Sequence, residues 1–251
     1  MILIKAKGGR YRKSTLSFFK NFIMNTQIKK LILISVLLAL AAISPNLFPA
    51  AQAGLASFPS LVSQFLFPSA ALILIIIIIA KILKYTDVIR LAINGIVAGI
   101  ISTVALEIFR ESGFRLGMMP GDLPRLIGVL ILNQFASGPD IWSDLAGWAY
   151  HFWNGAAFGL IFSLLLGQSK SWQGIFYGLL IGTGFMISPV VKSLGIGLFG
   201  ADFKKGYEFA TTVTIAHVAY GFTLSFLLMR LNKGIPNIWV RFKPMLSKNE
   251  I

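Results

Sequence analysis

The chain contains no cysteine, and it has few charged side chains for its 251 residues. Without thiols it can form no disulfide, thiolate metal site or cysteine nucleophile. Charged residues make up 13% of the chain and hydrophobic residues 56%, whereas soluble domains carry about 25% charged residues. The mean hydropathy is +0.77. These values predict an all-α, polytopic transmembrane helical bundle, because helices satisfy every backbone hydrogen bond within lipid.

Common catalytic motifs are also missing. The sequence has no H-E-x-x-H, no G-x-S-x-G and no G-x-x-x-x-G-K-[ST]. Asp140 and Asp144 flank Trp142, but paired carboxylates in an exposed loop are more typical of solvation than of catalysis. We therefore expect a small non-enzymatic membrane protein, with an oxidoreductase or an intramembrane hydrolase as the rival class.

The first apolar run differs from the others. Lys29 and Lys30 precede Leu31–Ser44, Pro45 and Pro49 are expected to break the helix, and Ala51-Gln52-Ala53 follows. A basic start, a short apolar run and an A-x-A ending are typical of a secretory signal peptide. Residues 1–53 are therefore predicted to be a basic N-terminus with a cleaved signal peptide or, alternatively, a retained anchor helix.

Five further spans are predicted within a transmembrane domain at 54–231, before a basic tail at 232–251. Leu123–Ala136 is too short to cross a bilayer, so it is predicted to be re-entrant or interfacial. Proline is expected to interrupt the fourth span at Ser188-Pro189. The predicted spans are Phe67–Leu83, Val88–Phe109, Leu145–Gly167, Trp172–Phe199 and Phe209–Leu231.

Charge placement orients these spans. With this layout, 17 of the 23 Lys and Arg residues lie on the side of both termini, and seven of the nine acids lie on the other side. The positive-inside rule then predicts a cytoplasmic C-terminus in a bacterial plasma (inner) membrane. The net charge of +14 predicts contact with the bilayer and with anionic lipid at the cytoplasmic face. Nucleic acid is not an expected partner, and protein partners and oligomeric state are left open.

Small residues recur every four positions on several spans. Such stripes let helix backbones approach closely in lipid, so we interpret them as packing seams. The glycines concerned are Gly95, Gly99, Gly155, Gly159, Gly174, Gly178, Gly182 and Gly221.

The only two histidines, His151 and His217, each precede a small-residue stripe. Counted from Ser143 and Phe209, near which their helices are expected to start, both lie eight residues in, about 12 Å along a helix. Glu107, Asn154 and Lys192 fall at similar depth, so these five residues are predicted to share one outer-leaflet polar slab.

Four interpretations of the slab stay open. The polar residues form interhelical hydrogen bonds, or they line a path for a proton, ion or small solute, as in a transporter or channel. Alternatively, His151 and His217 ligate haem b, or they bind a transition metal with help from a carboxylate such as Glu107. No cofactor is the first expectation.

Part of the chain resembles the YagU-like multi-pass bacterial inner-membrane proteins. The residues that carry the resemblance lie roughly within 147–231: His151, Asn154, Trp172-Gln173-Gly174, Pro189 and His217. The resemblance implies an inner-membrane location and no established chemistry.

Overall fold

The computed structural model describes residues 8–246, with side chains from 25 to 243. Helices account for nearly all of its regular structure, and the described residues contain no strand. In chain order the elements are α1 (Gly8–Gln52), α2 (Phe58–Leu61), the π-helical turn η1 (Val62–Leu66), α3 (Phe67–Ile82), α4 (Thr86–Arg115), α5 (Leu123–Ile131), α6 (Ile141–Leu166), α7 (Ser171–Met186), α8 (Pro189–Ser193), the 3₁₀ turn η2 (Leu198–Gly200), α9 (Gly206–Leu231) and α10 (Ile238–Leu246).

The predicted all-α transmembrane bundle is confirmed. Six helical stretches of the described residues are long and apolar enough to cross a membrane: Asn25–Gln52, Phe58–Ile82, Thr86–Arg115, Ile141–Leu166, Ser171–Ser193 and Gly206–Leu231. Five correspond to the predicted spans, and the sixth is the N-terminal segment. The chain is therefore a multi-pass membrane protein.

The expected helix break at Pro45 and Pro49 is wrong, because α1 continues to Gln52. Neighbouring helices hold its last turns in place. Leu47 and Phe48 are buried in a cluster with Tyr150 of α6, whose hydroxyl donates to the Ser44 carbonyl at 2.8 Å. Proline is tolerated in a membrane helix where such contacts compensate for the missing backbone donor.

Two other predicted irregularities match the structure. The Leu123–Ala136 segment contains only the nine-residue helix α5, which is too short to span a bilayer. Helix α7 ends at Met186, and the Ser188 side chain accepts a hydrogen bond from the Val190 N–H at the start of α8. The proline at 189 thus begins a new short helix.

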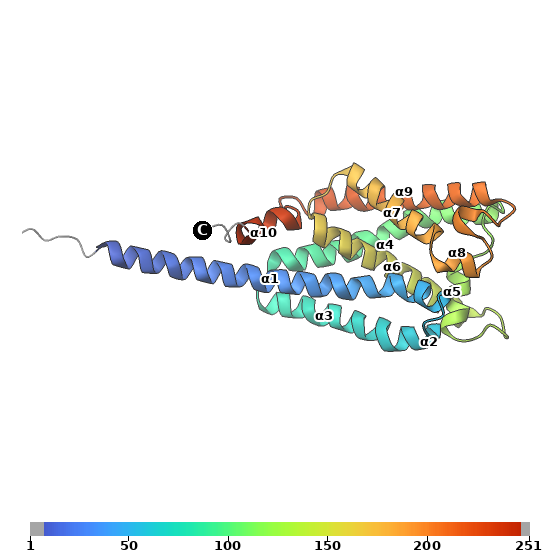
Figure 1. Cartoon of the computed structure of the whole chain (residues 1–251), viewed down its shortest axis with the longest axis horizontal. Coiled ribbons are helices and arrows are strands. Elements are labelled where there is room, and N and C mark those ends of the chain that lie inside the picture. The colour runs from blue at the N-terminus through green and yellow to red at the C-terminus, as the bar shows by residue number, and fades with distance from the viewer. Residues whose placement is uncertain (1–7, 247–251) are drawn as a thin grey trace, which may run out of the picture.

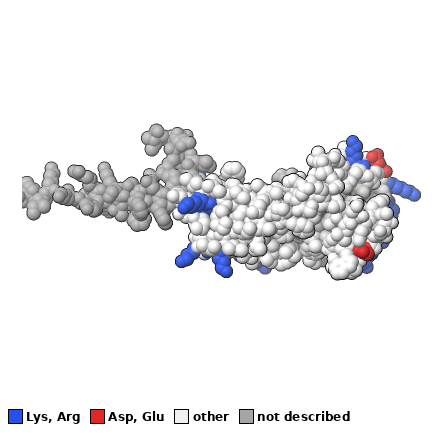
Figure 2. All heavy atoms as spheres, turned by 90° about the horizontal axis from the view of Figure 1, so that it is seen from below, with Lys and Arg blue, Asp and Glu red and all other residues white. Residues whose placement is uncertain are grey.

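The spans run up and down, so α1 enters and α10 leaves at the same end of the bundle (Figure 1). We call this the basic end; it carries Lys29, Lys30, Lys81, Lys84, Arg90 and Lys170. Helices α5 and α8 lie at the other end, the α5 end (Figure 1). Figure 2 shows a broad uncharged band between two charged ends, with the visible acidic side chains at the α5 end. This is the surface expected of a chain that crosses a bilayer.

Glycine seams hold the spans together in pairs. Along α4 and α6, a Cβ added to Gly99 would lie 2.3 Å from the Gly155 carbonyl oxygen, and one on Gly159 would lie 2.3 Å from that of Gly95. Along α7 and α9, a Cβ on Gly174 would lie 2.0 Å from the Gly221 oxygen. Backbones this close leave no room for any side chain.

Candidate functional site

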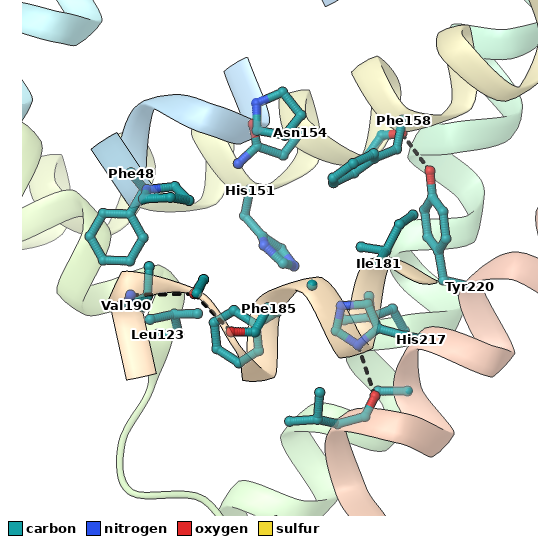
Figure 3. Close-up of a pocket in the computed structure, with 18 of the residues that line it drawn as sticks. Phe48, Leu123, His151, Asn154, Phe158, Ile181, Phe185, Val190, His217 and Tyr220 are labelled. Carbon is teal, nitrogen blue, oxygen red and sulfur yellow. Dashed lines mark hydrogen bonds between the residues drawn. The ribbon is translucent and has the colours of Figure 1, made fainter. Parts of the chain in front are cut away.

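A cavity of about 580 Å³ opens within the bundle toward the α5 end (Figure 3). Its lining comes from α1 and from α4 to α9, and most of it is apolar. Five strongly polar side chains interrupt this lining: Asn46, Arg110, His151, Asn154 and His217. Polar groups at this depth are costly and require partners, so their contacts define the site.

Glu107 does not line the cavity, but its carboxylate contacts both His151 and Arg110, which do. Its Oε1 is 2.8 Å from His151 Nε2, a close contact that lacks hydrogen-bond geometry. Arg110 donates from Nε to Glu107 at 2.7 Å, and its Nη2 lies 2.7 Å from Oε2. Glu107 is 9% exposed and Arg110 5% exposed. The carboxylate thus binds a guanidinium on one side and an imidazole on the other.

Two more acids surround the same arginine. Arg110 Nη2 lies 3.2 Å from Glu111, and Nη1 lies 3.3 Å from Asp122. Asp122 follows α4 in the loop before α5, where burial raises its pKa although the nearby Arg110 charge lowers it. We call Glu107, Arg110, Glu111, Asp122 and His151 the ion cluster.

The ion cluster has more negative than positive charge when the imidazole is neutral. Three carboxylates face the single guanidinium of Arg110, and Arg115 adds one positive charge through its 2.8 Å ion pair with Glu111. The balance is one excess negative charge. Buried charge is tolerated only when it is paired, so this imbalance bears on any ligand that enters the cavity.

His217 faces the cavity from α9 (Figure 3). Its Nδ1 lies 2.8 Å from the Val213 carbonyl oxygen, which only accepts, so Nδ1 carries the hydrogen. In this tautomer Nε2 is a free acceptor. The ring stacks on Phe185, with centroids 6.4 Å apart. Gly182 leaves room for the ring, since a Cβ there would lie 3.1 Å from His217 Cγ.

Asn154 connects the cavity wall to the N-terminal helix. Its Oδ1 accepts a hydrogen bond from the Ser44 hydroxyl of α1. Tyr220 of α9 donates at 2.7 Å to the Gly155 carbonyl of α6. These bonds fix α1 and α9 against α6, which carries His151.

The structure brings together four of the five predicted slab residues. Glu107 contacts His151, while Asn154 and His217 line the same cavity. Lys192 does not join them, because it is exposed on α8 and outside the lining. Sequence reasoning missed Arg110, although its spacing of three residues from Glu107 places both on one helix face.

Within the described residues, no group of three or more His, Cys, Asp or Glu side chains is arranged to hold a metal ion. His151 Nε2 faces the Glu107 carboxylate at 2.8 Å. Binding of haem b or of a transition metal therefore stays a prediction.

Comparisons with protein-family models, curated proteins and solved structures find no match. The resemblance to YagU-like proteins gains no support from them and stays a prediction.

Proposed function

We propose that this chain is a non-enzymatic protein of the bacterial inner membrane that binds a small amphipathic molecule in its cavity. The observation that carries the proposal is an apolar cavity of about 580 Å³ with a buried polar cluster at one wall. Small-molecule sites typically measure about 300–1,000 Å³ and combine apolar walls with a few polar groups.

The same proposal includes an orientation. The basic end faces the cytoplasm, as the positive-inside rule favours, and the cavity then lies toward the outer leaflet. At the basic end Trp239 of α10 is 74% exposed, and Lys243 on the same helix is also exposed. Exposed tryptophan beside basic residues is typical of a helix at an anionic lipid surface.

Retention of the N-terminal helix also belongs to the proposal. Ser44 is 1% exposed and bonds to both Tyr150 and Asn154. Removal of residues 1–53 would open one wall of the cavity, since Phe48 and Pro49 line it. Burial of this surface in the bundle is expected of a retained helix and not of a signal peptide that is cleaved off.

Binding is favoured over an open permeation path by the packing below the cavity. Toward the basic end, Asn232 donates to Ser163 at 2.9 Å, and Ser163 donates to the Leu91 carbonyl at 2.6 Å. The glycine seam of α4 and α6 runs between the cavity and this network. Transport would require the seam to open, whereas binding requires no rearrangement.

Photolabelling tests the proposal. Purified protein in nanodiscs is irradiated with a diazirine-bearing decanol, and the labelled peptides are mapped by mass spectrometry. We expect saturable labelling of cavity residues on α6 and α9 that excess decanol competes away. Ile181→Trp fills the cavity and should abolish this labelling, because Ile181 lines it.

Leu179→Trp is the matched control, since Leu179 is 38% exposed and outside the lining. It should label like the wild type. Labelling confined to lipid-facing residues of α3, without saturation, would exclude a binding site in the cavity.

A further inference from the structure

The cavity has a mouth on the side of the bundle. Among its lining residues, Asn46 of α1, Leu180 and Gly184 of α7 and Pro189 of α8 are exposed, Leu180 by 54%. Helix α1 packs on α6 and α8, while α7 packs on α9 and α8. The exposed lining residues therefore border a gap between α1 and α7 that α8 closes at the α5 end.

This mouth lies at bilayer depth. Asn46 is six residues before the end of α1, and Leu180 is six residues before the end of α7. At 1.5 Å per residue, both lie about 9 Å inside the helix ends. Helices α1 and α7 are both spans, so a molecule enters this mouth from among lipid chains and need not cross the headgroup surface.

The polar wall offers a hydrogen-bond acceptor. The Nε2 of His217 is a free acceptor on the cavity. A hydroxyl headgroup can donate to it, and a buried polar group without a partner is costly. Arg110 also lines the cavity, but its Nη1 faces Asp122 at 3.3 Å and is shielded from a ligand.

Charge selects among headgroups. The guanidinium of Arg110 already has three carboxylate partners, so an anion finds no unpaired cation at the cavity wall. These carboxylates lie outside the lining, so a cation finds no acid there. Taking an unpaired charge out of water is costly, so a neutral headgroup is favoured over either ion.

We propose that the cavity takes a neutral single-chain amphiphile, such as a monoacylglycerol or a long-chain alcohol, directly from the bilayer through the portal between α1 and α7. This inference rests on the proposed binding function and specifies its ligand class and route. The portal residues are Asn46, Leu180 and Gly184.

Gly184 provides the test of the route. A Cβ added there meets no atom within 4 Å, so a larger side chain fits without displacing a helix and projects into the mouth. Gly184→Trp should slow cavity labelling by the diazirine decanol at least tenfold. Thr183→Trp, exposed on the same helix and outside the lining, should label at the wild-type rate.

Competition with three oleoyl probes tests the ligand class. Monooleoylglycerol should displace the label at a concentration at least tenfold below that needed for oleate or oleylamine, which carry the same chain with an anionic or a cationic headgroup. Oleate or oleylamine as the best competitor overturns the neutral-ligand assignment.

The outcomes separate the two proposals. Saturable cavity labelling with equal rates in Gly184→Trp and Thr183→Trp overturns the portal and leaves the binding function intact. The absence of saturable cavity labelling in the wild type overturns the binding function, and the inference falls with it.

Discussion

The glycine seam between α7 and α9 allows a stability prediction with an internal control on one helix. In Gly174→Ala the new Cβ would lie 2.0 Å from the Gly221 carbonyl oxygen. Contacts below 3.0 Å are essentially never observed for Cβ atoms, so the two backbones must separate by at least the difference of 1.0 Å. Because a carbonyl oxygen on a packed helix cannot rotate away, the whole seam must shift.

Overpacking of this kind costs about 1–3 kcal/mol. Gly184→Ala introduces the same methyl group ten residues later on α7, where no atom lies within 4 Å. This control should gain about 0.5–1 kcal/mol, since alanine is the better helix former. The two variants should therefore differ by about 1.5–4 kcal/mol in their free energies of unfolding.

The assay is reversible unfolding in mixed micelles titrated with sodium dodecyl sulfate and followed by circular dichroism. A difference below about 0.5 kcal/mol between the two variants would refute the close-packed seam. Equal losses in both variants are one form of this outcome and would show that α7 tolerates no methyl group at either position, irrespective of its contact with α9.

Three further predictions concern polar groups. Glu107→Ala leaves Arg110 buried beside fewer acids and should cost about 3–5 kcal/mol in the same assay. The control Arg115→Ala, at a side chain 78% exposed, should change the free energy of unfolding by less than about 1 kcal/mol. Similar losses in the two variants would contradict the buried pairing. The Asn232→Ala variant removes three hydrogen bonds of a fully buried amide and should cost about 1–3 kcal/mol, a prediction that wild-type stability would disprove. The Asp140 carboxylate caps α6 by accepting a hydrogen bond from the Ser143 N–H, which lowers the pKa of Asp140. The stabilisation from this bond is therefore present above the unfolded pKa of about 3.9 and is lost as the pH falls through the folded value. Melting temperatures measured from pH 7 to pH 3 should therefore fall more steeply for the wild type than for Asp140→Asn, which caps without titrating; parallel curves would exclude this linkage.

The sequence predicted most of the helices because their signals are local. Apolar length, flanking charge and the break at Ser188-Pro189 are properties of short segments, and each has its counterpart in the structure. The end of α1 was mispredicted because the low helix propensity of proline was considered without the tertiary contacts that compensate for it. Contacts from Tyr150, about 100 residues later, support the helix there.

The site was only partly predictable for the same reason. Equal depth along their spans placed His151, His217 and Glu107 in one slab, but depth contains no information about the direction in which a side chain points. Lys192 satisfies the depth criterion and is nevertheless exposed. Arg110 was overlooked because a basic residue near the end of a span resembles an ordinary interfacial flank.

The bond between Ser44 of α1 and Asn154 of α6 joins residues 110 positions apart. At translation rates of about 5–20 residues per second, some 5–20 s separate the synthesis of these two residues. During that time α1 lies in the membrane without its partner, and its buried face is covered by lipid or by the insertion machinery. The cavity can form only after α6 and α9 have been inserted, so its assembly is one of the last steps in the biogenesis of this protein.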